Sequence, residues 1–279
     1  MSDVMLHSSS DRVMTLEELK KKVSFAFLDQ PSRKVSSKYV YVPTSRVIED
    51  LMALGWQPVN GAQRKAKQGK TSMFSKHMIK FQNPNIVIKG QNGDDVFPEI
   101  ILTNSHDGIT SFKFMMGLFR VVCSNGLVIA DKELANFKMR HMGYSFEDLQ
   151  ELVQKTVQEL PSKVEVINRM KTTTLTEEQQ RELALKAYLL RKGIGMGEQG
   201  SEVDAETIDA MLESRREQDK GNDLWLTFNR VQEAITQGGF MAALTGAKVR
   251  KVRKISSFEK DLKLNQELFQ LALEYVDQA

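Results

Sequence analysis

The chain has 279 residues, of which 41% are hydrophobic and 27% charged, a balance typical of a globular protein with a sizeable core. No apolar run approaches the roughly 20 residues that span a bilayer, and the polar, serine-rich start lacks the apolar segment of a secretory signal. A single cysteine excludes an internal disulfide framework and is typical of a reducing compartment. We therefore expect a cytoplasmic protein without a membrane partner.

The N-terminal half is predicted to be rich in strands, after a disordered start at residues 1–14. Thr15 and Glu18 form a capping box at the start of a short helix, and a second helix is predicted from Thr44 to Leu54. Alternation and β-propensity predict strands over residues 38–42, 56–59, 76–81, 85–88, 99–103 and 127–130, and a strand pair over 112–123 that breaks near Gly117.

From residue 145 onward the pattern changes to helices, predicted over residues 146–160, 176–190, 204–213, 223–237 and 261–276. Trp225 lies beside the apolar stripe of the helix that Asp223 caps, so we expect it to be packed. Strands followed by helices indicate an α+β fold. It would comprise a strand-rich antiparallel module at 15–144 and a helical module at 145–279, with a flexible Gly-rich linker at 193–203.

The formal net charge of +3 is small, but the charges are segregated along the chain. Residues 33–90 hold eleven basic and two acidic side chains, residues 141–220 hold eleven and sixteen, and residues 246–263 hold seven and two. Such segregation is expected of a surface that faces a polyanion. Basic and acidic segments that neutralise each other within the fold would give the same pattern.

Basic and aromatic residues are interleaved in the first basic segment, as a single-stranded nucleic acid would require for its phosphates and bases. The alternative is a solvated hairpin whose aromatics belong to the core. A second basic stretch follows at 248–254. The predicted nucleic-acid-binding residues are Arg64, Lys65, Lys67, Lys70, Phe74, Lys76, His77, Lys80, Lys248, Arg250, Lys251 and Arg253.

Two further patterns bear on enzyme chemistry. The run from Gly195 to Gly200 matches G-x-G-x-x-G, but no strand precedes it, so it is interpreted as a linker and no cofactor is expected. Cys123 with His106 or His141, and with Asn125, would offer a thiol and a base, yet an apolar run before Cys123 favours a buried core thiol. His106 and Asp107 are too few ligands for a metal, and a turn in which Asn104 and Asp107 bond their own backbone is favoured.

The stretches Asn104-Ser-His-Asp-Gly and Leu118-Phe-Arg-Val-Val-Cys-Ser-Asn-Gly-Leu-Val closely resemble a plasmid- and prophage-borne family, domain of unknown function 932. Further matching stretches, from Tyr39-Val-Tyr-Val-Pro-Thr to Gly238-Gly239, extend the resemblance over nearly the whole chain. It implies a mobile-element context but no activity. The order of a helix ending in Leu-Gly-Trp, a basic hairpin and an antiparallel sheet is also similar to Rad52-type single-strand annealing proteins, at the level of fold alone.

Three functions follow as hypotheses. The first is a non-enzymatic protein that binds single-stranded nucleic acid in recombination, annealing or DNA maintenance. DNA is favoured over RNA as the nucleic acid. The second is an anti-defence or accessory protein whose partner is a host protein. The third is an enzyme that uses the region of His106, Asp107 and Cys123. The sequence leaves open whether the chain forms a homo-oligomer.

Overall fold

The computed structural model describes two compact units. The described residues are 13–35, 39, 41–64, 73–89, 95–109, 112–120, 125–129, 145–198 and 202–277. The first unit comprises residues 1–89, 95–119 and 129–160, and the second comprises residues 90–94, 120–128 and 161–279. Strands dominate the first and helices the second, so the predicted α+β fold is confirmed.

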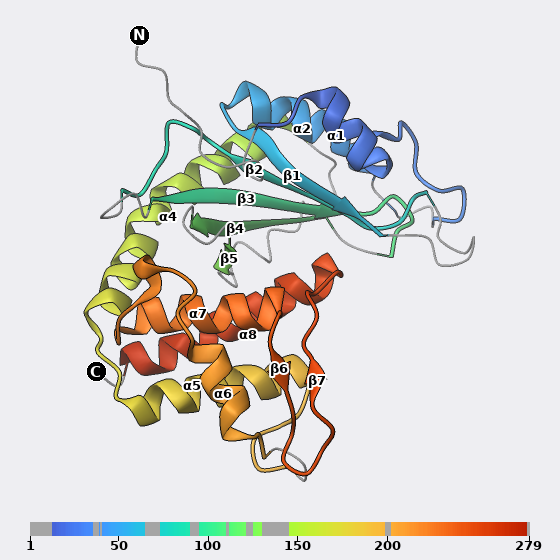
Figure 1. The fold of residues 1–279 in the computed structure, drawn as a ribbon. Coiled ribbons are helices and arrows are strands. Elements are labelled where there is room, and N and C mark those ends of the chain that lie inside the picture. Colours follow the sequence, from blue (N-terminus) through green and yellow to red (C-terminus); the bar gives the residue numbers. More distant parts are fainter. Residues whose placement is uncertain are drawn as a thin grey trace. The chain divides into compact units, whose positions relative to one another are not determined.

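The first unit is an antiparallel sheet with strand order β1-β2-β3-β4, on which helices pack (Figure 1). Its elements are α1 (Leu16–Lys22), the short 3-10 helix η1 (Ser24–Phe27), α2 (Thr44–Ala53), β1 (Gln57–Gln63), β2 (His77–Gln82), β3 (Val96–Asn104), β4 (Lys113–Arg120) and the first part of α4 (Phe146–Thr172). Helices α1 and α2 both lie on one face of this sheet.

The core of the first unit lies between α2 and the sheet. Apolar side chains recur along one side of α2 with the period of a helix, and along one face of β2 with the period of a strand. Val47, Ile48 and Leu51 recur along one side of α2 and are fully buried. Ile79 and Phe81 alternate along β2 and belong to the same buried cluster. The capping box predicted for α1 is also present, since Thr15 and Glu18 bond each other's backbone N–H groups.

Three strand predictions in this half are wrong. Tyr39, Tyr41 and Val42, the described part of the predicted strand 38–42, lie outside any strand, and the Val42 carbonyl instead accepts from the Asn104 side chain at 3.1 Å. The segment 85–88 forms only an isolated bridge, Ile88 to Val96. The predicted break near Gly117 is absent, because β4 passes straight through it.

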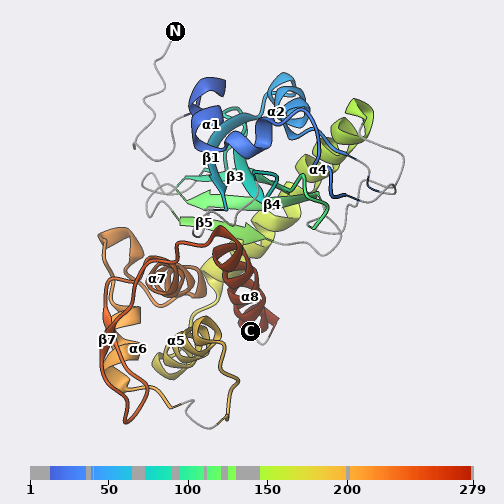
Figure 2. The ribbon, with the colours of Figure 1, turned by 90° about the vertical axis from the view of Figure 1, so that its right-hand side faces the viewer.

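The second unit is a cluster of helices with a small hairpin at its edge (Figure 2). Its elements are the end of α4, α5 (Glu177–Lys192), α6 (Ala205–Leu212), the short η3 (Glu217–Asp219), α7 (Leu224–Gln237), β6 (Met241–Ala242), β7 (Arg250–Lys251) and α8 (Phe258–Asp277); residues 125–128 of β5 (Asn125–Ile129) also belong to it. Helices α5, α7 and α8 pack pairwise.

The centre of the second unit is α7, whose side chains are buried almost all round. Asp223 caps it by accepting from Leu226 N at 2.9 Å, as predicted. Trp225 is buried and stacks on Phe228 with ring centroids 6.3 Å apart. The expected packing of Trp225 is therefore confirmed.

Helix α4 is longer than predicted. The sequence predicts an end at Leu160, but the helix continues through Pro161 to Thr172. A proline removes one backbone donor, a cost that the rest of a 27-residue helix offsets here. The division between the two units falls at this proline. Among the described residues, no helix combines the length and the apolar character needed to cross a membrane.

Candidate functional site

The basic residues predicted in the first unit are only partly described. Arg64 is exposed, while Phe74, Lys76 and Lys80 are half-buried. Lys65, Lys67 and Lys70 lie outside the described residues. The backbone N–H of Arg64 donates to the carbonyl of Lys76 at 3.0 Å, so these two residues lie opposite each other on neighbouring chain segments.

Strand alternation places Lys76 and Lys80 on one face of the sheet and His77 on the other. Lys80 does not offer a free charge on that face. Its ammonium group lies 3.0 Å from the carboxylate of Glu99, which is buried and also accepts from Gln82 at 3.1 Å. A cation that is compensated by a buried carboxylate contributes little attraction for a phosphate.

His77 belongs instead to a buried polar cluster around the hydroxyl of Thr44. The oxygen of that hydroxyl lies 2.9 Å from Nε2 of His77 and 3.0 Å from Nε2 of His106. Asn104 donates to the same oxygen at 3.0 Å. All four side chains are buried, so His77 does not share the surface of Lys76 and Lys80.

The partners of the cluster determine which ring nitrogens carry protons. Nδ1 of His77 lies 3.3 Å from the carbonyl of Ser75, which can only accept, so this nitrogen is protonated and Nε2 of the neutral ring accepts. Thr44 therefore donates its single proton to His77, and His106 must donate to Thr44 through Nε2. Nδ1 of His106 then holds a bare lone pair, and this buried atom has no hydrogen-bond partner in the described part of the chain.

Burial also keeps both rings neutral. Desolvation lowers the pKa of His77 to about 3, with a smaller contribution from the neighbouring His106. Desolvation likewise lowers the pKa of His106 to about 4, and the carboxylate of Asp107 offsets only part of this effect. Both values lie well below neutral pH, in agreement with the tautomers that the hydrogen bonds require.

The cluster has the components of an activated nucleophile, but its geometry favours a structural role. Thr44 donates to His77, which the carbonyl of Ser75 orients. The hydroxyl of Thr44 is fully buried, however, and accepts from both His106 and Asn104, which occupy its lone pairs. A nucleophile needs a free lone pair and room for a substrate, and the Thr44 hydroxyl has neither.

The turn after β3 agrees with the structural interpretation of Asn104 and Asp107. The side chain of Asn104 accepts from the backbone of Ser105 at 2.8 Å, and that of Asp107 accepts from the backbone of Ile109 at 3.0 Å. Cys123 lies outside the described residues. In the part of the chain that the structure describes, no group of three or more His, Cys, Asp or Glu side chains is arranged to hold a metal ion.

The second predicted basic stretch forms an exposed hairpin in the second unit. Strands β6 and β7 pair antiparallel, with Met241 opposite Lys251 and Ala242 opposite Arg250. We call the cations of this segment the hairpin cations; they are Lys248, Arg250, Lys251, Arg253 and Lys254. All five are exposed, and within the described residues none of them forms an ion pair.

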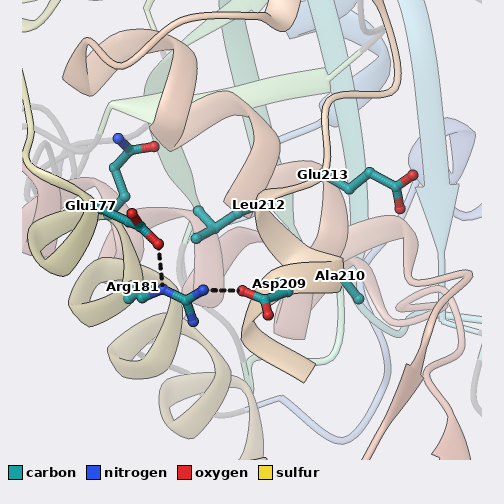
Figure 3. Close-up of a pocket in the computed structure, with 7 residues that line it drawn as sticks. Glu177, Arg181, Asp209, Ala210, Leu212 and Glu213 are labelled. Carbon is teal, nitrogen blue, oxygen red and sulfur yellow. Dashed lines mark hydrogen bonds and ion pairs between the residues drawn. The ribbon is translucent and has the colours of Figure 1, made fainter. Parts of the chain in front are cut away.

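A shallow pocket of about 520 Å³ lies between α5 and α6 (Figure 3). Its one cationic side chain, Arg181, is held between the carboxylates of Glu177 at 3.2 Å and Asp209 at 2.6 Å. Glu213 adds a third carboxylate to the lining. The pocket therefore carries excess negative charge and is unsuited to a phosphate, so the hairpin is the better candidate site.

Comparison with known proteins identifies relatives without a described activity. A family model described as "Domain of unknown function (DUF932)" matches residues 32–269. The UPF0380 protein YfjQ of Escherichia coli (strain K12) is 30% identical over 262 residues, which cover 94% of this chain and 91% of YfjQ. The UPF0380 protein YafZ of the same strain is 31% identical with the same coverage. No solved structure matches the chain.

Proposed function

We propose that this chain, which belongs to the family with domain of unknown function 932, is a non-enzymatic protein that binds single-stranded nucleic acid. The observation that carries the proposal is the set of five hairpin cations, exposed and without acidic partners among the described residues. The proposed setting is recombination, annealing or DNA maintenance in a plasmid or prophage. This setting, unlike the binding itself, is proposed from the sequence resemblance alone.

The composition around the hairpin supports a polyanionic partner. No acidic residue occurs between Glu233 and Glu259, so nothing in this segment neutralises the hairpin cations. Each cation that contacts a phosphate releases condensed counterions, which is the main favourable term in sequence-independent binding. In contrast to Lys80, whose charge Glu99 compensates, the hairpin cations have no charge partner among the described residues to give up on binding.

A single strand is favoured over a duplex because exposed cations and a half-buried aromatic occur together. Phe240 directly precedes β6, and its backbone carbonyl accepts from Val252 at 2.8 Å, beside the hairpin cations. An aromatic face stacks with unpaired bases, which a duplex covers with their neighbours. Phe74 beside Lys76 offers the same combination in the first unit.

Charge reversal of the hairpin tests the proposal. In Lys248→Glu/Arg250→Glu/Lys251→Glu, the plot of log affinity against log salt should flatten by about 2, since single strands contribute roughly 0.7 per contacted phosphate. At 1 M salt the variant and the wild type should bind alike. A slope difference of about 2 then makes the variant bind about a hundredfold more weakly than the wild type at 0.1 M salt. Fluorescence anisotropy with a labelled 20-nucleotide single strand and its duplex measures both quantities.

The matched control is Lys171→Glu/Lys220→Glu/Lys263→Glu, which changes the net charge equally at exposed positions outside the hairpin. The control should bind within about twofold of the wild type. Equal weakening by both triple variants would show a diffuse charge effect rather than a site. Absence of salt-dependent oligonucleotide binding in the wild type would contradict the proposal and favour a host protein as the partner.

A further inference from the structure

The hairpin exposes apolar side chains among its cations. Met241 is 54% exposed and Val249 is 52% exposed, although side chains of this kind are normally covered. In the same hairpin Ala242 and Val252 are buried. One side of the ribbon therefore packs on the helical unit, and the other presents apolar atoms to solvent.

The register explains why these apolar atoms lie next to cations. Met241 is directly opposite Lys251, so both side chains project from the same face of the ribbon. Val249 lies two residues from Lys251 and, by alternation, on this same outward face. Met241 is thus across the ribbon from Lys251, and Val249 precedes Lys251 on the same side, so both apolar side chains neighbour this cation.

The ribbon is fixed in place by its anchors. The backbone of Ala243 donates to the hydroxyl of Thr207 on α6 at 3.0 Å, and Gly239 donates to Val252 at 2.9 Å. Gly238 has φ +67°, and a Cβ there would lie 2.5 Å from the Val252 carbonyl oxygen. Such close backbone packing holds the outward face in one conformation, which lowers the entropic cost of binding.

We propose that Met241 and Val249 form the base-contacting part of the hairpin, against which unpaired bases of a single strand lie while the hairpin cations hold its phosphates. The inference rests on the proposed function and adds to it how the protein distinguishes single strands from duplexes. Unpaired bases present apolar faces that gain free energy when they leave water. The same faces are stacked inside a duplex, where the outward side chains meet only the charged backbone.

Charge and apolarity together favour a nucleic acid over an anionic membrane. Helices that bind membrane surfaces present an extended apolar face rich in Trp, Phe and Leu. The outward face of the hairpin has one thioether and one small aliphatic side chain. A cation also occurs on the side of the ribbon to which buried Ala242 belongs, at Arg250, where a flat membrane would not reach but a flexible strand would.

The test compares Met241→Ser/Val249→Ser with the matched control Ile109→Ser/Met196→Ser, which removes two other exposed apolar side chains. Three labelled 20-mers are the probes: oligo(dT), a mixed-sequence duplex and an abasic sugar-phosphate strand. The hairpin variant should bind oligo(dT) about tenfold more weakly at every salt concentration. Its salt slope should not change, because apolar contacts release no counterions.

The other probes separate the outcomes. Binding of the duplex and the abasic strand should be the same in the wild type and the hairpin variant, and the control should match the wild type on all three probes. Unchanged oligo(dT) affinity, or equal losses on oligo(dT) and the abasic strand, would overturn the inference. Loss of binding to phosphatidylserine vesicles, with oligonucleotide binding intact, would assign the face to membranes. If the wild type binds oligonucleotides and the charge reversal weakens it, the proposed function stands whatever the serine variant does.

Discussion

Thr44→Val should lower the free energy of unfolding of the first unit by about 3 kcal/mol. The substitution removes the hydroxyl on which Nε2 of His77, Nε2 of His106 and the Asn104 amide converge, while the shape of the side chain is nearly kept. Each buried polar group that loses its partner costs roughly 1–3 kcal/mol. Asn104 retains the carbonyl of Val42, but the two imidazole nitrogens have no second partner in the described cluster.

The two tryptophans allow this loss to be measured in the first unit alone. Trp56 belongs to the core of the first unit and Trp225 to α7, so a Trp225→Phe background leaves Trp56 as the reporter. Urea unfolding followed by Trp56 fluorescence then gives the free energy difference. Thr44→Ser is the control, because it keeps the hydroxyl and removes one methyl group at a cost of about 1 kcal/mol. Equal destabilisation by Val and Ser would show that the hydroxyl does not organise the cluster.

The parts of the fold that local chemistry determines were predictable. The capping box of Thr15 and Glu18 and the cap at Asp223 place the starts of α1 and α7 correctly. The segment 38–42 was not predictable from its alternation, because a backbone carbonyl in it bonds the side chain of Asn104, 62 residues further along the chain. The side chain of a residue distant in sequence thus takes the place of the neighbouring strand's backbone, which the local pattern leads one to expect.

The polar cluster was missed for the same reason. Thr44 and His77 are 33 residues apart, and Thr44 and His106 are 62 apart, so no spacing motif connects them. A signal was present in the strands themselves, since His77 begins β2, Asn104 ends β3, and the two are paired across these strands. Two polar residues at apolar strand positions indicate a buried partner, although not that the partner is Thr44.

The hairpin of β6 and β7 was predictable in its charges but not in its packing. Its cations are evident from the sequence, and Val249 and Val252, three residues apart, fall on opposite faces of a strand that holds both. What the sequence does not provide is the register with β6, which buries Val252 and leaves Val249 exposed. That difference depends on packing against α6 and α7, since Thr207 and Gly238 hold the two strands in place.

Acid should destabilise the first unit from about pH 6.5 downward, before most carboxylates titrate. The pKa values of His77 and His106 in the folded protein, about 3 and about 4, lie below the unfolded value of about 6.5. Between the folded and unfolded values the unfolded chain binds more protons, so stability falls as the pH falls. The stabilisation is complete above pH 6.5, and its loss should reach on the order of 3 kcal/mol per ring at pH 4.

Urea unfolding of the Trp225→Phe protein at pH 7.5, 6.5, 5.5 and 4.5 measures this dependence through Trp56. The control is His77→Gln/His106→Gln, which keeps a donor and an acceptor at each position but cannot titrate. This variant should be less stable than the wild type at pH 7.5, and its stability should change little between pH 6.5 and 4.5. The two curves should therefore converge as the pH falls. Parallel curves would mean that protonation of other groups, and not of these two buried rings, drives the acid transition.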